Sequence, residues 1–499
     1  MDWRWLLTVP ATEAEAVARL PRQRLLYARL RAAVLAGRLV AGTRLPASRE
    51  LATELGLARN TVLWAYGQLT AEGVLRATRH GTWIAPVAPT TPAVTAPSPR
   101  RRPDAAAATP PDGLPPLSRR AQTLRGEEVE PALMPFALGM PDVADFPARA
   151  WRASLDRAWR QASARQLGYS PGGGEPVLRQ ALAGYLGASR GLPVRAEQVI
   201  VTAGTQAGLD LCARLLADAG DTAWVENPGY PAARAALALA GLQLHGVPVD
   251  GEGLAPTAAD WARHRPRLVV VTPSHQFPTG AVMSLPRRLA LIEQARTHGA
   301  WILEDDYDSE FRRGGALLPA LLGLREQAPV IYAGTFSKTL FPGLRLGYLV
   351  VPPERAAAFA AAAAQALRPG QGIEQVALAD FIVRGAYTTH LRRMRRRYAL
   401  RRETLRACLL QSFGPHGAVV TGGEAGLHLT LWWRQGPADV ALAQAALAQG
   451  VMARPLSRYA LAPLHPPGVQ GLVLGFGCAP QARIACAVER LLQAWQQVA

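Results

Sequence analysis

The chain has 499 residues, of which 49% are hydrophobic and 18% are charged, a composition that suits globular material divided into more than one domain. Its 55 Lys plus Arg outnumber 37 Asp plus Glu, which leaves a net charge of +18, and Lys338 is the only lysine. Apolar runs are too short to span a membrane, the N-terminus lacks a secretory signal and the four cysteines have no paired spacing, so we expect a cytoplasmic protein without disulfides or a metal site.

The first 85 residues have the spacing of a helix-turn-helix followed by a β-wing. Helical periods are predicted over 25–37, from an N-cap at Ser48 to a turn at Gly56, and over 58–72, and strands over 74–76 and 82–84. In such a motif the first residues of the second helix face the base edges of DNA. The segment holds 12 Arg against 6 Asp plus Glu, a net of +6. A helical protein-interaction domain with an arginine-rich surface is the alternative.

The stretches 42–52 (GTRLPASRELA) and 57–62 (LARNTV) resemble the signature of the GntR-type winged helix. The resemblance implies binding to double-stranded DNA, with side chains of the second helix on phosphates and bases and the wing in the minor groove. The residues expected at this interface are Arg44, Ser48, Arg49, Arg59, Asn60, Thr61, His80, Gly81 and Thr82.

A proline-rich segment follows this domain. Ten of the 31 residues from Pro86 to Pro116 are proline, and the others are mainly Ala, Thr, Ser and Arg. Such a segment lacks the apolar surface that folding requires, so it reads as a linker with polyproline character. We expect the domains to cover residues 1–85 and 131–499, with the linker over 86–130.

From about residue 131 onward, short apolar strands alternate with helical segments, which predicts an α/β domain with a mostly parallel sheet. Lys338 directly follows one such strand, and the run Glu304-Asp305-Asp306-Tyr307 ends another. In an open α/β sheet both would lie at the carboxyl ends of strands, where ligands bind. Arginine replaces lysine almost freely on a surface but cannot supply an amine that attacks a carbonyl, so Lys338 is either a chance survivor or a site of amine chemistry.

Two cofactor chemistries use a lysine at this edge of a sheet. A phosphate loop for nucleotide hydrolysis needs Gly before its Lys and a helix after it, whereas Ser337 precedes Lys338 and Pro342-Gly343 follows closely. Pyridoxal 5′-phosphate needs a lysine for a Schiff base, a carboxylate for its ring nitrogen and groups that bind phosphate. The segment 201–207, in which a strand runs into Gly204 and a helix start, and Arg345 suit the phosphate.

The segments 226–231, 272–280, 304–311 and 334–345 resemble fold-type I aminotransferases, and in particular the aminotransferase-like half of MocR-type regulators. The resemblance implies a smaller C-terminal α+β subdomain from about residue 370. Lys338 would carry the Schiff base, Asp305 would pair with the ring nitrogen and Tyr307 with the ring phenolate. The further cofactor contacts it implies are Tyr230, Gly204, Thr205, Gln206, Thr335, Ser337 and Arg345.

Simpler readings exist for several of these residues. Tyr230 would serve turn packing and Thr205 would cap a helix, while Asp306 is expected to be the bystander of the acidic pair. His275 is a candidate acid or base, but we expect its side chain to make a structural hydrogen bond instead. The arginine-rich segment 390–406 is expected to be a solvated helix face, with a supplementary DNA contact as the alternative.

One departure from the catalytic aminotransferases bears on activity. They place Asn before Pro-Thr-Gly, where it hydrogen-bonds the ring oxygen, whereas this chain has Phe277. The protein is therefore not expected to be a multi-turnover enzyme, although a half-transamination is compatible with the site. An effector carboxylate would be held by Arg454 or Arg458.

These features favour a DNA-binding transcriptional regulator that senses an amino compound, or the cofactor itself, by aldimine exchange at Lys338. The linker suits a head-to-tail homodimer, as in MocR relatives. An active aminotransferase with an appended DNA-binding domain is the alternative.

Overall fold

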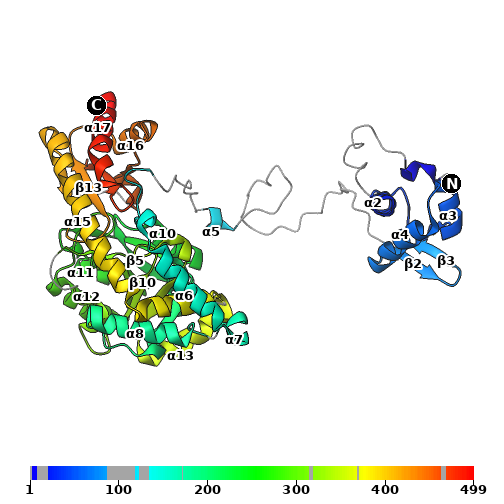
Figure 1. Cartoon of the computed structure of the whole chain (residues 1–499), viewed down its shortest axis with the longest axis horizontal. Coiled ribbons are helices and arrows are strands. Elements are labelled where there is room, and N and C mark those ends of the chain that lie inside the picture. Colours follow the sequence, from blue (N-terminus) through cyan, green and yellow to red (C-terminus); the bar gives the residue numbers. More distant parts are fainter. Residues whose placement is uncertain are drawn as a thin grey trace. The chain divides into compact units, whose positions relative to one another are not determined.

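The computed structural model describes residues 3–7, 21–86, 118–122, 134–170, 172–313, 318–367, 370–461 and 468–499. The chain divides into two compact units, Met1–Thr109 and Pro110–Ala499, and each unit is described by itself (Figure 1). Most of the predicted linker, including residues 87–117, lies outside the described residues. Within it, α5 (Arg119–Gln122) is described, and Arg120 donates to the carbonyl oxygen of Leu239 at 3.2 Å, so this turn lies against the C-terminal unit.

The N-terminal unit is a helical domain with a small antiparallel sheet. Its elements are the 3₁₀ turn Arg4–Leu7, α2 (Arg22–Leu35), α3 (Ser48–Leu55), α4 (Arg59–Ala71), β1 (Arg44–Leu45), β2 (Leu75–Thr78) and β3 (Gly81–Ile84). The strand order is β1-β3-β2. Leu26, Leu30, Leu51, Val62 and Leu69 are at most 1% exposed and bring the three helices onto one core. This is the predicted winged helix-turn-helix.

The start of α3 differs from its prediction. Ser48 is not the N-cap but the first helical residue, and Ala47 occupies the cap position. The backbone N–H of Ala47 donates to the carboxylate of Glu50 at 3.1 Å, so a side chain from the first turn of the helix caps the backbone here, and no side chain at the cap position does. The predicted turn is confirmed, because Gly56 ends α3 with a φ of +63°, a conformation that glycine adopts without strain.

The C-terminal unit contains a mostly parallel sheet, as predicted. Its strands are β4 (Val199–Thr202), β5 (Thr222–Asn227), β6 (Gln243–Asp250), β7 (Gly253–Leu254), β8 (Leu268–Val271), β9 (Trp301–Asp306), β10 (Val330–Thr335) and β11 (Gly347–Val350). The order is β4-β11-β10-β9-β8-β5-β6-β7, and β7 and β11 run antiparallel to their neighbours. Because β11 is antiparallel to both β4 and β10, these two strands run in the same direction as each other and as β9. The carboxyl ends of β4, β9 and β10 therefore lie at one edge of the sheet.

Helices cover both faces of this sheet. They are α6 (Ala148–Arg160), α7 (Ala164–Leu167), α8 (Pro176–Arg190), α9 (Thr205–Leu216), α10 (Pro231–Ala240), α11 (Ala258–Arg263), α12 (Leu285–His298), α13 (Pro353–Ala362) and α14 (Gly372–Val383). On β10, Ile331 and Ala333 join one apolar cluster with α9, while Tyr332 between them joins another with α8 and α14. Alternation along a strand thus supplies two separate cores, which explains why these strands are apolar without interruption.

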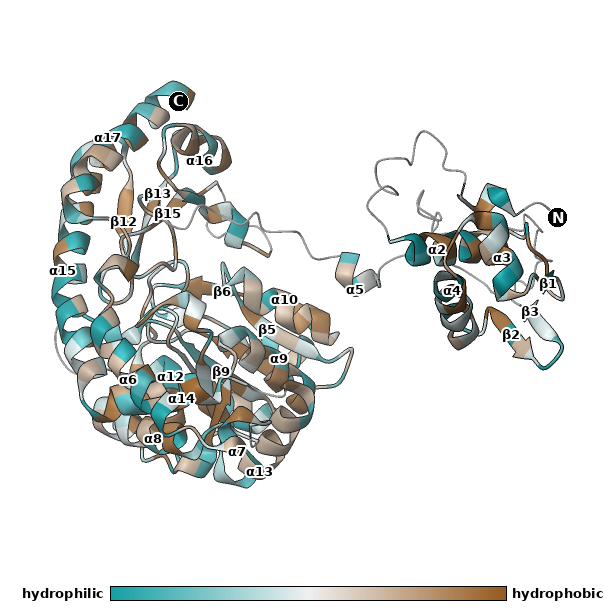
Figure 2. Ribbon diagram, turned by 45° about the vertical axis from the view of Figure 1, so that its right-hand side comes forward, coloured by the Kyte–Doolittle hydropathy of each residue, from teal (hydrophilic) through white to brown (hydrophobic). Residues whose placement is uncertain are grey.

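A second, four-stranded antiparallel sheet lies near the C-terminus. It contains β12 (Val419–Thr421), β13 (His428–Trp433), β14 (Arg454–Pro455) and β15 (Gln470–Gly475) in the order β12-β13-β15-β14. Three helices pack with it: α15 (Ala386–Phe413), α16 (Asp439–Ala448) and α17 (Gln481–Val498). Figure 2 shows hydrophilic residues recurring along the whole of α15. Among the described helices, none is both long and apolar enough to cross a membrane.

Candidate cofactor site and nucleic-acid interface

Lys338 follows β10 and is half-buried in the C-terminal unit. Its Nζ donates a hydrogen bond to the carbonyl oxygen of Gly139 at 2.9 Å. Burial lowers the pKa of this amine and Arg345 lowers it further, while Asp308 and Asp305 act in the opposite direction. A lowered pKa increases the fraction of neutral amine, which is the form that attacks a carbonyl.

Asp305 lies beside this lysine's strand, because β9 and β10 run parallel with Asp305 opposite Ala333. The carboxylate is 5% exposed, and its Oδ1 has no hydrogen-bond partner among the described residues. Burial raises its pKa to about 7, Asp306 and Glu226 raise it too, and Lys338 lowers it. A buried carboxylate with an unused oxygen is suited to a cationic ring nitrogen, which would replace the lost hydration.

A cradle of backbone and arginine forms where β4 leads into α9. Gly204 is the N-cap of α9 with a φ of +89°, and a Cβ there would lie 3.2 Å from Nη2 of Arg345. Nη2 of Arg345 also donates to the carbonyl oxygen of Ala203 at 3.2 Å. Thr205 is therefore the first residue of the helix and not its cap. A helix N-terminus beside a guanidinium is an anion site, so this place fits a phosphate.

The remaining predicted phosphate contacts divide into two groups. Thr335 and Ser337 lie together at the end of β10, with their hydroxyl oxygens 3.2 Å apart. The side-chain amide of Gln206 instead donates to the carbonyl oxygen of Ala232 at 2.7 Å. Gln206 therefore offers the cradle its backbone N–H, while its side chain ties α9 to the start of α10.

Aromatic side chains line the side of the site that would face a ring. Phe277 makes edge contacts with Tyr230, Tyr307, His428 and Tyr459, at centroid distances of 5.8, 6.2, 5.3 and 5.0 Å. Burial and the surrounding carboxylates raise the pKa of Tyr307 well above its ordinary value, so its hydroxyl keeps its proton and can donate. Tyr230 remains 40% exposed, which leaves an open approach beside Phe277.

Glu226 and its partners belong to the site but had no predicted role. Its buried carboxylate accepts from the hydroxyl of Thr272 at 2.6 Å and from the side-chain amide of Gln276 at 3.0 Å. Burial raises its pKa to about 7, and these hydrogen bonds lower it. Both partners lie in the segment 272–280, one of the segments that resemble fold-type I aminotransferases. The order of apolar and polar residues in the sequence did not indicate that this segment contacts β5.

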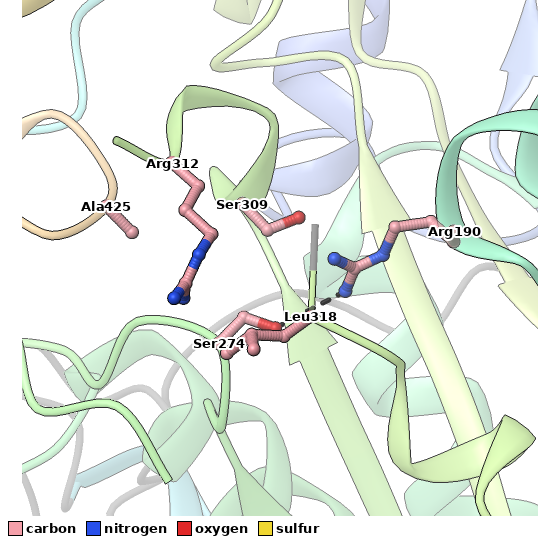
Figure 3. Close-up of a pocket in the computed structure, with 6 residues that line it drawn as sticks. All are labelled: Arg190, Ser274, Ser309, Arg312, Leu318 and Ala425. Carbon is pink, nitrogen blue, oxygen red and sulfur yellow. Dashed lines mark hydrogen bonds between the residues drawn. The ribbon is translucent and has the colours of Figure 1, made fainter. Parts of the chain in front are cut away.

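Asp306 faces away from the site, as expected for a bystander. It forms an ion pair with Arg190 at 2.5 Å and accepts from Ser309 and Tyr332 at 2.8 and 2.6 Å. Arg190 also donates to Ser274 at the edge of a small hollow between side chains that has essentially no room for a water molecule (Figure 3). The other lining residues are Ser309, Arg312, Leu318 and Ala425. Neither Lys338 nor Asp305 lines this hollow, so it is separate from the cofactor site.

The two arginines considered for an effector carboxylate occupy different environments. Arg454 on β14 is paired with Val473 on β15, and paired residues of antiparallel strands point to the same face. Val473 packs with Tyr459 and Phe277, so Arg454 lies on the face of this sheet that is turned toward the aromatic side chains. Arg458 is exposed, and its carbonyl oxygen accepts from Arg234 at 3.3 Å. Strand pairing therefore places Arg454 on this face of the sheet, while Arg458 is exposed on the short helix Leu456–Tyr459.

The arginines of α15 hold the unit together in a way that the sequence did not indicate. Arg401 pairs with Asp142 at 2.5 Å, and Arg393 and Arg397 each pair with Asp145 at 3.3 Å. Three turns of the helix are therefore tied to one loop ahead of α6. Arg401 is buried, whereas Arg393 and Arg397 remain exposed while they make these ion pairs, so the segment 390–406 keeps much of the predicted solvated face.

The residues expected to contact DNA gather on two exposed features of the N-terminal unit. Arg59 and Asn60 are exposed and Thr61 is half-buried at the start of α4, while Ser48 is half-buried and Arg49 exposed at the start of α3. His80 is exposed in the wing and Gly81 and Thr82 are half-buried. Arg44 lies against this wing, with its guanidinium 5.8 Å from the ring of Trp83 and its Nε 3.0 Å from where a Cβ of Gly81 would be.

Comparison with known proteins supports both units. The family model for aminotransferase class I and II matches residues 133–469, and the model for bacterial regulatory proteins of the gntR family matches residues 22–84. A similar solved structure is the α-aminoadipate aminotransferase LysN from Thermus thermophilus, with a TM-score of 0.69 and 29% identity over 76% of this chain and 97% of that one. The fold and site thus define a protein that joins a DNA-binding winged helix to a pyridoxal 5′-phosphate-binding domain.

Curated relatives share the whole arrangement. The probable rhizopine catabolism regulatory protein MocR from Rhizobium meliloti is 42% identical, over 92% of this chain and 90% of the relative. The transcriptional regulator TauR from Rhodobacter capsulatus is 36% identical, over 85% and 86%. The pyridoxine biosynthesis regulator PdxR from Corynebacterium glutamicum is 36% identical, over 76% and 77%. The chain belongs to the aminotransferase class I and II family and, with its GntR domain, is a pyridoxal 5′-phosphate-dependent transcriptional regulator of the MocR type.

Proposed function

We propose that this regulator senses a small amino compound that competes with Lys338 for the cofactor. The observation that carries the proposal is the pairing of the only lysine, whose pKa is lowered by burial, with the unused carboxylate oxygen of Asp305 on the neighbouring strand. When bound, pyridoxal 5′-phosphate supplies an aldehyde that reacts reversibly with primary amines. Occupation of the site by an effector amine would release the Lys338 side chain, which now contacts Gly139.

The other residues of the site would orient the cofactor. Asp305 would face its ring nitrogen, Tyr307 its phenolate oxygen and Tyr230 its ring face. The phosphate would be held by Gly204, Thr205, Gln206, Thr335, Ser337 and Arg345. Gln206 would take part through its backbone, since its side chain is bonded to Ala232.

For the effector, the placement of the two arginines favours an amino acid whose carboxylate meets Arg454. We expect R454A to weaken the response to such an effector by about tenfold or more, because a charge-assisted hydrogen bond contributes roughly 1.5–3 kcal/mol. The measurement is a titration of candidate amino acids followed by the absorption of the bound cofactor. R458A removes the same charge from an exposed position four residues away and is expected to leave the titration unchanged. Equal losses in both variants, or none in R454A, would contradict this assignment.

A catalytic aminotransferase is the second candidate, and the family membership of the domain is the observation that favours it. Against rapid turnover stands Phe277, which has no polar atom to offer the ring oxygen where it lies between Tyr230 and Tyr307. We expect incubation with amino acids and 2-oxoglutarate to convert no more substrate than one half-reaction per protomer allows. Many cycles per protomer, counted against an active aminotransferase as positive control, would establish the enzyme instead.

A third possibility is that the cofactor itself is the signal. Operator affinity would then change with pyridoxal 5′-phosphate alone and stay the same when an amine is added. The amine-sensing proposal requires the opposite, namely a change in operator binding on adding the amine to the cofactor-loaded protein. The proline-rich linker supports a head-to-tail homodimer as the form in which the signal passes to the DNA-binding domains.

A further inference from the structure

His275 and Asp308 form a buried pair directly behind the hydroxyl of Tyr307. Nδ1 of His275 lies 3.1 and 3.2 Å from the two carboxylate oxygens of Asp308, and 3.0 Å from the hydroxyl oxygen of Tyr307. The same hydroxyl lies 3.0 Å from the backbone carbonyl oxygen of His275. His275 and Asp308 are each 2% exposed, so water does not compete for these contacts.

The carboxylate decides which ring nitrogen carries the proton. Since an ionised Asp308 can only accept hydrogen bonds, Nδ1 of His275 must be the N–H donor toward it. Nδ1 has a single proton, so the hydroxyl oxygen of Tyr307 can accept only by sharing it with Asp308, and it cannot donate to Nδ1. The proton of Tyr307 is left to point at the carbonyl oxygen of His275 or at a ligand. Nε2 of His275 has no partner among the described residues, which agrees with this tautomer.

Packing holds the imidazole in this orientation from several sides. A Cβ on Gly426 would lie 2.1 Å from Nδ1 and Cε1 of His275 and 2.4 Å from Oδ2 of Asp308, so the loop before β13 closes directly on the pair. The ring of His428 lies 4.6 Å from that of His275. Burial and the neighbouring His275 lower the pKa of His428 well below its ordinary value, which keeps this second ring neutral.

A bound cation is the other occupant that these side chains suggest. The candidate ligand atoms of His275, Asp308 and His428 lie within 4.8 Å of one another. The Asp308 oxygens already lie at hydrogen-bond distance from Nδ1, however, and Nε2 of His428 lies 3.1 Å from the carbonyl oxygen of Pro278. A metal ion would have to displace both contacts, so the hydrogen-bonded chain accounts better for the geometry.

We propose that His275, held by Asp308, is a positioning residue that fixes the hydroxyl of Tyr307 for the phenolate oxygen of the cofactor. The inference rests on the proposed role of Tyr307 and extends it by two residues that do not contact the reacting atoms. The negative charges near Tyr307 belong to Asp308, Asp305, Glu226 and Asp306, and all of them favour its protonated form. The hydrogen-bonded pair therefore holds a hydroxyl that retains its proton and can turn it from the carbonyl oxygen of His275 to a ligand.

The test is the pH midpoint at which the absorption of the bound cofactor changes. A donor to the phenolate stabilises its negative charge, so its loss makes the cofactor hold a proton to higher pH. We expect Y307F to raise the midpoint by about one pH unit, the equivalent of one charge-assisted hydrogen bond. H275A and D308N should shift it in the same direction, and the double variant Y307F/H275A should shift it no further than Y307F alone.

Two further variants separate positioning from general stability. H275N places an amide nitrogen close to the position of Nδ1 and is expected to return the midpoint toward the wild-type value. H245N removes a histidine from a partly exposed His–Asp pair on β6, where His245 and Asp260 are 3.8 Å apart, and is expected to change nothing.

Each outcome decides between distinct conclusions. A wild-type midpoint in H275A and D308N, together with a shift in Y307F, overturns the positioning role while the role of Tyr307 stands. No shift in Y307F overturns the proposed contact of Tyr307 itself. Should H275A not fold, D308N and H275N decide the question, because a wild-type midpoint in D308N contradicts the proposal.

Discussion

Replacement of Lys338 by alanine is expected to abolish covalent attachment of pyridoxal 5′-phosphate completely. Because this is the only lysine of the chain, borohydride reduction of the loaded wild-type protein should add one cofactor-derived mass, located at residue 338. No arginine can substitute, since its guanidinium stays protonated and does not form the imine. Mass spectrometry of the reduced, digested protein reads out the result.

K338R is the matched control for this experiment, since it retains the positive charge near Asp305 and Asp308 while removing the reactive amine. It should behave as K338A does in the reduction assay. A reducible cofactor that remains attached to K338A would mean that another amine, such as the N-terminus, carries it. The assignment of Lys338 would then fall, and with it the proposed sensing of amines at this position.

Loss of operator binding is the second large effect that we expect, on substituting the exposed start of α4. R59A or N60A should weaken specific binding about tenfold to a hundredfold, because a base contact contributes roughly 1–3 kcal/mol. The measurement is a binding titration against DNA selected by the wild-type protein, repeated at several salt concentrations. A variant that loses only a phosphate contact should also show a shallower dependence on salt.

R38A offers a control with the same loss of charge. Arg38 is exposed in the same unit, and its guanidinium lies 5.1 Å from the ring of Trp5. It belongs neither to α4 nor to the residues predicted to contact DNA. Equal losses in R38A and R59A would show that net charge alone determines binding. The assignment of α4 as the helix that reads the bases would then be wrong.

Much of the fold followed from local patterns. The apolar strands, the glycine turn at Gly56 and the basic wing were all predicted within a few residues, because strand pattern and turn chemistry depend on near neighbours. The N-cap of α3 was predicted one residue too late, at Ser48, because serine is a common cap residue. In the structure Ala47 occupies the cap position, and its backbone N–H donates to the carboxylate of Glu50.

The tertiary structure decided the contacts between distant segments. Strand register, and not the spacing of the two arginines, places Arg454 beside Val473, on the face of the sheet where Val473 packs in one cluster with Phe277. The ion pairs that Arg401 and Arg393 of α15 make were not predicted, because their partners, Asp142 and Asp145, lie some 250 positions earlier in the chain. Such pairings depend on how helices and sheets pack, which no local window contains.

By itself the sequence determined which functional groups this protein carries: one amine at Lys338, a buried-strand carboxylate at Asp305, for which the family resemblance implies a ring nitrogen as partner, and a basic helix-turn-helix. These depend on which functional groups exist and on motifs a few residues long. Only the tertiary structure decided how the groups are aimed, as in the chain from Asp308 through His275 to Tyr307. Hydrogen bonds act over about 3 Å, and only folding brings side chains that are more than thirty residues apart within that distance.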